Sequence, residues 1–340
     1  MVVGTHEYFM HLALEEAWKY QGKTYPNPAV GCAVVSKEGA LLALEAHQKA
    51  GAPHAEVNAL KSAYLKLTND TTISTLQSSA ETHSFLRLHH KNIFSSVRLY
   101  TTLEPCSHYG KTPSCASLIA ALGIKEVYVG SLDTNPLASA GNALLQEAGV
   151  ETQSALLADD CRDLIEPFIL WQEEQFVFFK WAQRLNATVE AGNVSSLQSR
   201  ESVHAMRAVC DLLIIGGNTV RVDRPTLDAR LVGGDAPDVL ILSREKEFDT
   251  SIPLFHVKGR KVFVESDLSR VKEYKNIMIE GGQKMFELTR DIVDFYLCFV
   301  APKFGGSQGF TNIEDNFKIL NLQKESEDII MWMKRVEGER

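Results

Sequence analysis

The sequence lacks any apolar run of about 18 residues, the length expected of a membrane-spanning helix. Its 45% hydrophobic and 23% charged residues are instead ordinary for a globular protein. The opening stretch, MVVGTHEYFMHLALEE, also lacks the basic region and apolar block of a secretory signal. We therefore expect no membrane partner and a cytoplasmic location.

Cysteine is scarce as well, with six in 340 residues. Without an export signal, this content predicts reduced thiols rather than a disulfide framework. We expect Cys32, Cys161, Cys210 and Cys298 to fill the core, because none has neighbouring residues that suit a metal site.

Basic residues do not dominate either, since the formal net charge is −8 at pH 7. Because nucleic-acid binding needs clustered Lys and Arg, we expect no nucleic-acid partner and favour a small-molecule substrate.

The length predicts two domains, which we place at 1–150 and 151–340. In the first, helices and strands alternate, which indicates a layered α/β fold with helices covering the sheet. The expected helices are 7–19, behind a Thr5 cap, 54–64, 114–123 and 141–148, and the expected strands are 29–35, 97–104 and 126–131. Residues 66–91 are rich in Thr, Ser, Asn, Gln and His without a clean period, so we expect an exposed insertion there.

Strands interleaved with helices predict a largely parallel sheet in the second domain too. The expected strands are 175–182, 211–216, 238–242, 261–265, 276–281 and 294–301, with helices at 200–209 and 284–290. Two glycine pairs, Gly216-Gly217 and Gly281-Gly282, follow apolar strands. Such glycines let a cofactor approach the backbone closely. Neither pair forms the G-x-G-x-x-G pattern, so a plain tight turn is the alternative.

The first domain holds a group of residues suited to a metal. His54, Cys106 and Cys115 supply one imidazole and two thiolates, three ligands of a tetrahedral zinc site whose fourth position is left for water. Zinc makes hydroxide available near neutral pH, and Glu56 is placed to carry a proton from that water to a leaving amine. H-x-E with P-C-x-x-C is typical of zinc nucleobase deaminases, although here eight residues separate the cysteines. The alternative is that both cysteines are buried apolar residues.

Four motifs in order resemble the deaminase half of the bifunctional riboflavin-biosynthesis deaminase/reductase family. They are TYPNPAVGCAVV (24–35), HAEVNAL (54–60), TLEPCSHYGKTPSC (102–115) and DTNP (133–136). The resemblance implies a cytidine-deaminase-like domain with zinc on His54, Cys106 and Cys115 and Glu56 as proton shuttle. It also implies a substrate pocket lined by Asn27, His47, His108, Lys111 and Asp133.

The second domain is similar to the reductase half of the same family, which implies a dihydrofolate-reductase-like fold and NADPH. The resemblance places Ala182, Gly216, Gly217, Thr219, Asp223, Gly281, Gly282 and Gln283 at the cofactor. It places Arg207, Leu227, Arg230 and Glu280 at the substrate's ribose phosphate, and gives Lys180 and Asp223 catalytic roles. The sequence departs from the family at Arg184-Leu185-Asn186-Ala187, where S-L-D-G is common, and at Asn193, which replaces a tryptophan.

The resulting hypothesis is a bifunctional enzyme of riboflavin biosynthesis. It would deaminate 2,5-diamino-6-(5-phosphoribosylamino)pyrimidin-4-one and then reduce the ribosyl group with NADPH, giving 5-amino-6-(5-phosphoribitylamino)uracil. One alternative is a deaminase of nucleic acid or free nucleosides, which leaves the second domain without a role. Another is a binding protein with a purely structural zinc, which needs a fourth protein ligand such as His108. By family resemblance we also expect a homo-oligomer.

Overall fold

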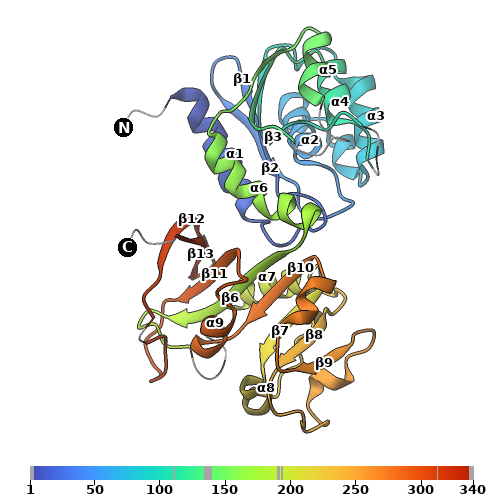
Figure 1. Cartoon of the computed structure of the whole chain (residues 1–340). Coiled ribbons are helices and arrows are strands. Elements are labelled where there is room, and N and C mark those ends of the chain that lie inside the picture. Colours follow the sequence, from blue (N-terminus) through green and yellow to red (C-terminus); the bar gives the residue numbers. More distant parts are fainter. Residues whose placement is uncertain are drawn as a thin grey trace. The chain divides into compact units, whose positions relative to one another are not determined.

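The chain is described here by a computed structural model, which covers residues 4–108, 110, 112–133, 140–189, 192, 194–311 and 313–336. Its contacts divide the chain into two units, Met1–Ile169 and Leu170–Arg340 (Figure 1). Among the described residues no helix has the length and apolar character needed to span a bilayer. The boundary that we predict between the deaminase and reductase domains, at 150/151, stays a prediction.

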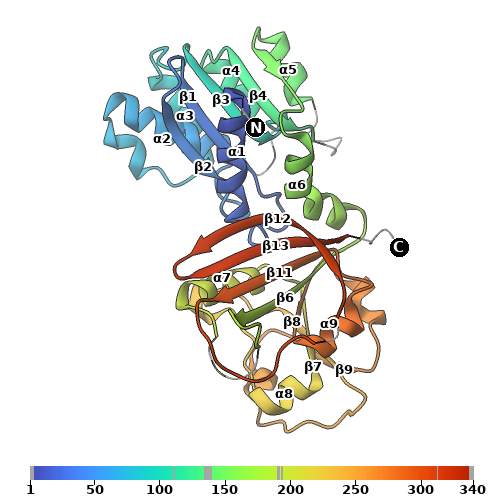
Figure 2. The ribbon, with the colours of Figure 1, turned by 90° about the vertical axis from the view of Figure 1, so that its left-hand side faces the viewer.

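The first unit is a five-stranded sheet with helices on both faces. Its strands are β1 (Gly31–Ser36), β2 (Leu41–Ala46), β3 (Val97–Leu103), β4 (Glu126–Ser131) and β5 (Glu151–Gln153), in the order β2-β1-β3-β4-β5. Its helices are α1 (Thr5–Trp18), α2 (Ala55–Thr68), η1 (Thr71–Thr75), α3 (Ser79–His89), α4 (Cys115–Ala121), α5 (Gly141–Glu147) and α6 (Ala158–Glu173), the last crossing the division. Figures 1 and 2 show α1 on one face of the sheet and α2, α3 and α4 on the other. The predicted layered α/β fold is confirmed.

The strand directions explain where the first unit can hold a ligand. β1 runs antiparallel to β2 and β3, whereas β3, β4 and β5 are parallel to one another. The carboxyl ends of the parallel strands therefore lie at one edge of the sheet, where α/β folds place their sites. Cys106 follows β3 at this edge, and Asp133 follows β4.

Residues 66–91, expected to form an exposed insertion, are mostly exposed, but they have regular structure and contribute some core residues. α2 continues to Thr68, and α3 covers much of the remainder. The side chains of Ile73 and Leu86 are fully buried in the core of this unit. A capping box starts α3, because Ser78 accepts from the Glu81 amide while Glu81 accepts from the Ser78 amide. We did not predict α3 because the composition of this segment is polar, although the S-x-x-E pattern of Ser78 and Glu81 marks the start of the helix.

The first helix begins one residue earlier than a Thr5 cap requires. Gly4 is the N-cap, and its amide donates to the Glu7 carboxylate at 3.0 Å.

The four cysteines expected in the core are all buried, as predicted: they are Cys32, Cys161, Cys210 and Cys298.

The second unit is built on an eight-stranded sheet. Its strands are β6 (Phe176–Arg184), β7 (Leu212–Gly216), β8 (Asp238–Leu242), β9 (Val262–Glu265), β10 (Asn276–Glu280), β11 (Phe295–Ala301), β12 (Asn316–Glu325) and β13 (Asp328–Val336). The order is β12-β13-β11-β6-β10-β7-β8-β9, antiparallel only at β12, β13 and β11. Its helices are α7 (Leu197–Arg207), α8 (Gly217–Asp223), η2 (Arg230–Val232), η3 (Pro253–His256), η4 (Ser269–Glu273) and α9 (Gln283–Thr289). The largely parallel sheet is as predicted.

Both faces of this sheet are covered, with α7 and α9 on opposite sides (Figure 2). Met285 and Phe286 of α9 pack with Val177, Ile214 and Ile279 from the central strands. Burial on both faces accounts for the continuous apolar runs of β7 and β10. Both runs end at a glycine pair, so the chain turns from buried strand to helix at the carboxyl edge of the sheet.

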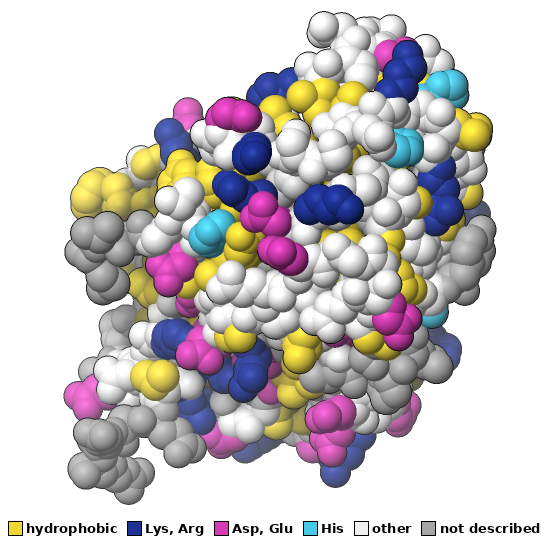
Figure 3. All heavy atoms as spheres, turned by 90° about the horizontal axis from the view of Figure 1, so that it is seen from above, with side chains coloured by type: hydrophobic (Ala, Val, Ile, Leu, Met, Phe, Trp, Pro, Cys, Tyr) yellow, Lys and Arg dark blue, Asp and Glu magenta, His cyan; other side chains and the backbone are white. Residues whose placement is uncertain are grey.

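The surface seen in Figure 3 carries charge of both signs. Lys and Arg side chains lie among Asp and Glu side chains over the described residues of that face. Neighbouring charges of opposite sign partly cancel, so this face does not present a strong field of one sign.

Candidate functional site

The three predicted metal ligands meet at the carboxyl edge of the first sheet. Their ligand atoms all lie within 4.8 Å of one another, and they form the one such group found among the described residues. His54 Nδ1 is 3.7 Å from Cys106 Sγ and 3.5 Å from Cys115 Sγ. A tetrahedral zinc with bonds of about 2.3 Å to sulfur and about 2.0 Å to nitrogen separates such atoms by about 3.6 Å. The donor set and its spacing therefore fit zinc.

Local backbone structure brings His54 and Glu56 to one cavity. Residues two apart on a regular helix point to different sides. His54 escapes this limit because it is the N-cap of α2, with extended backbone angles of φ −69° and ψ 163°, while Glu56 lies in the first turn. The H-x-E motif thus places ligand and carboxylate on the same cavity wall.

Glu56 is buried, with 4% of its surface exposed. Burial raises its pKa to about 7, an effect that neighbouring His54 opposes. On the neighbouring sulfurs, the hydrogen bond from Cys115 holds the pKa of the Cys106 thiol below its usual range despite burial. The Cys115 amide also points at Cys106 Sγ, at 3.4 Å, which favours a thiolate there.

Thr112 is a site residue that the sequence reasoning missed. Its Oγ1 lies 3.2 Å from His54 Nε2, on the side of the ring away from the two sulfurs. A hydrogen bond from Nε2–H to this hydroxyl leaves Nδ1 unprotonated and directed at the sulfurs. Its place three residues before Cys115 was the available signal.

A cavity of about 310 Å³ opens in front of the cluster. The predicted substrate residues that line it are Asn27, His47, His108 and Asp133. His108 is solvent-exposed and does not belong to the metal cluster found among the described residues, so the fourth ligand that a purely structural zinc requires is not supplied by His108. Lys111 lies outside the described residues, as do 134–136 of the DTNP motif.

Hydrogen bonds fix the orientation of His47 and Asn27. His47 Nδ1 is 3.1 Å from the Pro53 carbonyl, so this nitrogen carries the proton and donates. Burial lowers the pKa of His47 to about 4, which keeps the ring neutral. Its Nε2 therefore accepts from Asn27 Nδ2 at 3.2 Å. With its NH2 group used in this way, Asn27 has its carbonyl oxygen available as an acceptor.

Glu104 is a second residue that the sequence reasoning missed. It lies between β3 and Cys106, and 6% of its surface is exposed. One carboxylate oxygen accepts from the Asp133 amide at 3.2 Å and the other from the Asn142 amide at 2.9 Å. Glu104 therefore ties the strand that carries Cys106 to the segment that carries Asp133.

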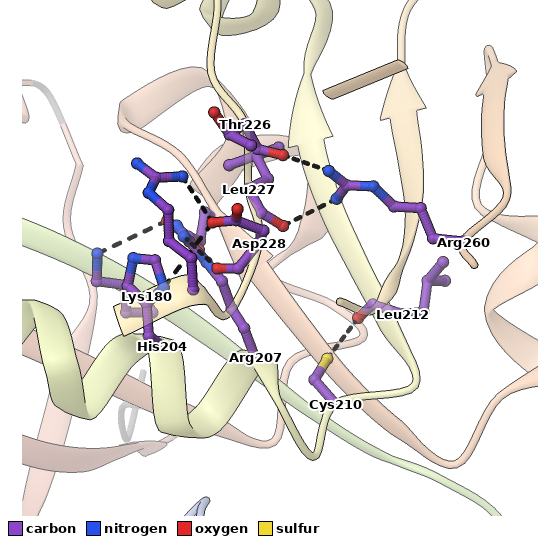
Figure 4. Close-up of polar contacts among 11 residues, drawn as sticks. Lys180, His204, Arg207, Cys210, Leu212, Thr226, Leu227, Asp228 and Arg260 are labelled. Carbon is purple, nitrogen blue, oxygen red and sulfur yellow. Dashed lines mark hydrogen bonds and ion pairs between the residues drawn. The ribbon is translucent and has the colours of Figure 1, made fainter. Parts of the chain in front are cut away.

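In the second unit Lys180, Arg207 and Glu280 form a buried ionic group. β6 and β10 are parallel neighbours in which Lys180 stands opposite Glu280, with Nζ 3.7 Å from Oε2. Arg207, at the end of α7, donates Nε to Glu280 Oε1 at 2.8 Å, with NH2 2.7 Å from the same oxygen. Figure 4 draws Lys180 and Arg207 among these polar contacts.

The charges of this group shift one another's pKa values. Burial lowers the pKa of Lys180, while the carboxylate of Glu280 opposes that shift. Burial alone would raise the pKa of Glu280, but Arg207 and Lys180 outweigh it and hold the value below the usual range. All three side chains are 12–13% exposed.

Two more predicted substrate residues follow α8: Leu227 lies on the loop and Arg230 at the start of η2. Arg230 NH1 binds Asp228 Oδ1 at 2.6 Å, and Arg207 NH1 donates to the Asp228 carbonyl at 3.4 Å. Leu227 is buried, whereas the Arg230 side chain is 60% exposed. The guanidinium of Arg207 is thus occupied by protein acceptors, and its predicted role as a phosphate ligand remains a prediction.

The predicted cofactor residues lie at the carboxyl ends of three adjacent strands, β6, β10 and β7. They are Ala182 on β6, Gly281, Gly282 and Gln283 after β10, and Gly216, Gly217, Thr219 and Asp223 on β7 and α8. Three of the glycines are close to protein atoms: an added Cβ at Gly216, Gly217 or Gly281 would lie 3.1, 2.7 or 2.5 Å from Met285 or Ser243. At Gly282 the nearest atom would be Val189 Cγ2 at 3.7 Å, which leaves ordinary space.

Gln283 uses its side chain within the protein. Its NH2 group donates to the Thr311 carbonyl at 2.6 Å, and its carbonyl accepts from the Thr311 amide at 2.8 Å. The predicted contact of Gln283 with the cofactor stays a prediction.

The departure from the family at Arg184-Leu185-Asn186-Ala187 forms a tight turn. Asn186 donates to the Gly305 carbonyl at 2.9 Å, and Ala187 has a φ of 59°, in the left-handed region that glycine occupies without strain. This positive φ explains why a glycine is common at the position of Ala187 in the family. Asn193 lies outside the described residues.

Comparisons with known proteins agree with both units. The family model for the cytidine and deoxycytidylate deaminase zinc-binding region matches residues 3–131, and the model for the RibD C-terminal domain matches residues 175–330. The chain is 32% identical to riboflavin biosynthesis protein RibD of Aquifex aeolicus (strain VF5), with 96% of this chain and 98% of that protein aligned. The chain belongs to the RibD family.

Further relatives match over most of their lengths. RibD of Actinobacillus pleuropneumoniae is 29% identical, with 90% of this chain and 86% of that protein aligned. A diaminohydroxyphosphoribosylaminopyrimidine deaminase/5-amino-6-(5-phosphoribosylamino)uracil reductase of Thermotoga maritima is similar in structure, with a TM-score of 0.63, 26% identity and coverage of 98% and 99%. Acinetobacter baumannii RibD, at 24% identity and a TM-score of 0.64 with coverage of 99% and 100%, supports the fold.

Family membership decides between the hypotheses. The chain carries a cytidine-deaminase-like domain and a RibD reductase domain, and so has the two enzymatic domains of a bifunctional riboflavin-biosynthesis protein. The zinc-binding family and the His54–Cys106–Cys115 cluster together support Zn²⁺, and the reductase domain fits a pyridine nucleotide.

Proposed function

We propose that the chain first deaminates 2,5-diamino-6-(5-phosphoribosylamino)pyrimidin-4-one and then reduces the ribosyl group of the product with NADPH. The final product is 5-amino-6-(5-phosphoribitylamino)uracil. The observation that carries the proposal is the cavity in which Glu56 faces a three-ligand zinc cluster, in a chain that also contains a RibD reductase domain. We assign deamination to residues 1–150 and reduction to 151–340.

For deamination, His54, Cys106 and Cys115 hold the metal. Bound zinc supplies a Lewis acid that lowers the pKa of a water molecule. Glu56 would carry a proton from the attacking water to the leaving amine, as the carbon–oxygen bond forms and the carbon–nitrogen bond breaks. Asn27, through its side-chain carbonyl oxygen, would accept from an amino group of the pyrimidine, while its NH2 group bonds to His47. His108, Lys111 and Asp133 complete the predicted substrate contacts.

For reduction, NADPH supplies hydride when bound near Ala182, Thr219, Asp223 and the backbone of Gly281, Gly282 and Gln283. Lys180 would donate a proton to the ring oxygen of the ribosyl group as hydride reaches the anomeric carbon and the bond between that carbon and the ring oxygen breaks. Its lowered pKa suits that task, and Glu280 keeps its ammonium group in place. Leu227 and Arg230 contact the ribose phosphate part of the substrate. A cytoplasmic location and a homo-oligomer remain expectations.

The test is the mass spectrum of the products formed by the purified, zinc-loaded protein from the diaminopyrimidinone ribotide and NADPH. The ribityl uracil is expected. If the deaminated ribosyl compound accumulates instead, the assignment of reduction to residues 151–340 is wrong. Unchanged substrate would refute the assignment of deamination to residues 1–150.

A further inference from the structure

Arg260 reaches from the turn before β9 to the loop between α8 and η2. Its NH1 donates to the Leu227 carbonyl at 2.8 Å, and its NH2 donates to the Thr226 carbonyl. Figure 4 shows the Arg260 side chain extended toward these two carbonyls. Two adjacent backbone carbonyls are thus held by one planar guanidinium.

The loop that Arg260 holds has an unfavourable backbone. Leu227 has a φ of 56° and Arg224 a φ of 45°, both in the left-handed region that side chains with a Cβ avoid. Such conformations persist where surrounding contacts over-determine them, and they cluster at ligand clamps. Arg224 is held by Asp249 at 2.7 Å and by Ser251 at 2.6 Å. Arg260 provides the corresponding support at Leu227.

The same loop leads directly to the buried ionic group. Asp228 follows Leu227, accepts from Arg207 through its carbonyl, and binds Arg230 through its carboxylate. Arg207 in turn binds Glu280, the partner of Lys180. A shift of the loop at Leu227 would therefore move groups that contact the predicted reaction site.

Arg260 is retained in surroundings that are costly for a cation. Burial lowers its pKa to about 10, so it stays charged at neutral pH. Its Nε is buried and has no hydrogen-bond partner among the residues that the structure describes. A guanidinium with one unsatisfied buried donor is a poor choice for filling space alone, which points to its two carbonyl contacts as the reason for its presence.

We infer that Arg260 is a positioning residue for the reduction step, fixing the loop of residues 224–230 so that Leu227 and Arg230 meet the substrate's ribose phosphate. The inference rests on the proposed function of the second unit. In this role Arg260 would act through the loop, by its bonds to the Leu227 and Thr226 carbonyls, and not by touching substrate or cofactor. Its loss should therefore weaken binding of the ribosyl substrate more than it slows the chemical step or weakens binding of NADPH.

The experiment compares Arg260→Met with Arg270→Met in steady-state reduction of the deaminated ribosyl substrate. Arg270 is a matched control, because it stacks over Phe263 of β9 and binds Glu265 and Glu273, none of which is in the loop. For Arg260→Met we expect the KM for the ribosyl substrate to rise about 10- to 100-fold, with kcat and the KM for NADPH within about threefold of wild type. Ammonia release by the first unit should not change in either variant.

Several outcomes would overturn the inference. One is a substrate KM for Arg260→Met that matches that of Arg270→Met; another is a collapse of kcat and NADPH binding together, which indicates a purely structural role. If Arg260→Met does not fold, Arg260→Lys decides, because it keeps the charge but cannot span both carbonyls: a raised substrate KM supports the role and an unchanged one refutes it. A wild-type protein that releases ammonia but reduces nothing refutes the proposed function itself, and the inference with it.

Discussion

Replacing Glu280 by Gln should sharply destabilise the second unit. The change leaves Lys180 and Arg207 buried without their shared carboxylate, at 12–13% exposure. Removing one partner of a buried ionic group costs about 3–5 kcal/mol. The Gln carbonyl can still accept from Arg207, so we expect the lower end, about 3 kcal/mol.

A double-mutant cycle isolates the interaction of Glu280 with Lys180. Lys180→Met removes one of the two cations that Glu280→Gln leaves unpaired, so the double variant should recover about 1–2 kcal/mol relative to the sum of the single changes. Glu265→Gln is the control: its carboxylate binds Arg270, but the pair is about twice as exposed and should cost less than about 1 kcal/mol.

Urea unfolding followed by tryptophan emission is a suitable assay, since Trp171, Trp181 and Trp332 lie in the second unit and only Trp18 in the first. With a slope of about 2–3 kcal/mol per molar urea, a loss of about 3 kcal/mol lowers the midpoint by roughly 1–1.5 M. Because the folded pKa of Glu280 is depressed, its contribution is present above its ordinary value of 4.5 and is lost as the pH falls through the folded value. The wild type and Glu280→Gln should therefore converge on acidification. A cost below about 1 kcal/mol, or additivity within about 0.5 kcal/mol, would refute the reasoning.

Three further changes test other parts of the molecule. Glu56→Gln should lower the rate of ammonia release by about 10²- to 10⁴-fold while metal analysis still finds zinc bound, and a zinc-free variant would count against the proton-shuttle role. Thr112→Val should weaken zinc binding about 10- to 100-fold in competition with a chelator, whereas Thr112→Ser keeps the hydroxyl; equal affinities in all three proteins would contradict the role of Thr112 in orienting His54. Ala187→Gly should raise the urea stability of the second unit by about 0.5–1 kcal/mol because Ala187 has a φ of 59°, and a lower stability would show that the turn is not strained.

Much of the fold follows from the sequence because buried strands leave a plain pattern. The apolar run at 276–281 corresponds to β10 and that at 97–104 to β3, each within one residue. The failures have particular causes. β12 is an edge strand with only exposed and half-buried positions, so it has no apolar run to find. α3 has a polar composition, and only the Ser78–Glu81 capping box gave a usable signal.

The candidate site divides in the same way. The groups that hold a metal could be predicted, because thiolates, an imidazole and a carboxylate in motif spacing have few other uses. Thr112, Glu104 and Arg260 were not predicted, since each acts on another protein group: a ring nitrogen, two backbone amides and two carbonyls. The pairing of Lys180 with Glu280 depends on the register between β6 and β10, which lie a hundred residues apart in the chain.

In the second unit, loop residues with a strained backbone lie beside polar groups that hold the loop by hydrogen bonds, which we call clamps. Ala187, Arg224 and Leu227 all have positive φ, and each lies beside a polar clamp: Asn186 and Thr188 on the Gly305 carbonyl, Asp249 and Ser251 on Arg224, and Arg260 on the Leu227 carbonyl. Relieving strain and removing a clamp should therefore have opposite effects. Ala187→Gly lowers the free-energy cost of the positive φ at this position, while the bonds from Asn186 and Thr188 to Gly305 still hold the turn. Stability should therefore rise, and the reduction rate should not change. Arg260→Met leaves the backbone strain at Leu227 but removes the hydrogen bonds that favour this conformation. The loop should therefore sample other conformations, and the substrate should bind less tightly. If both changes altered stability and left substrate binding alone, the clamps would serve folding only.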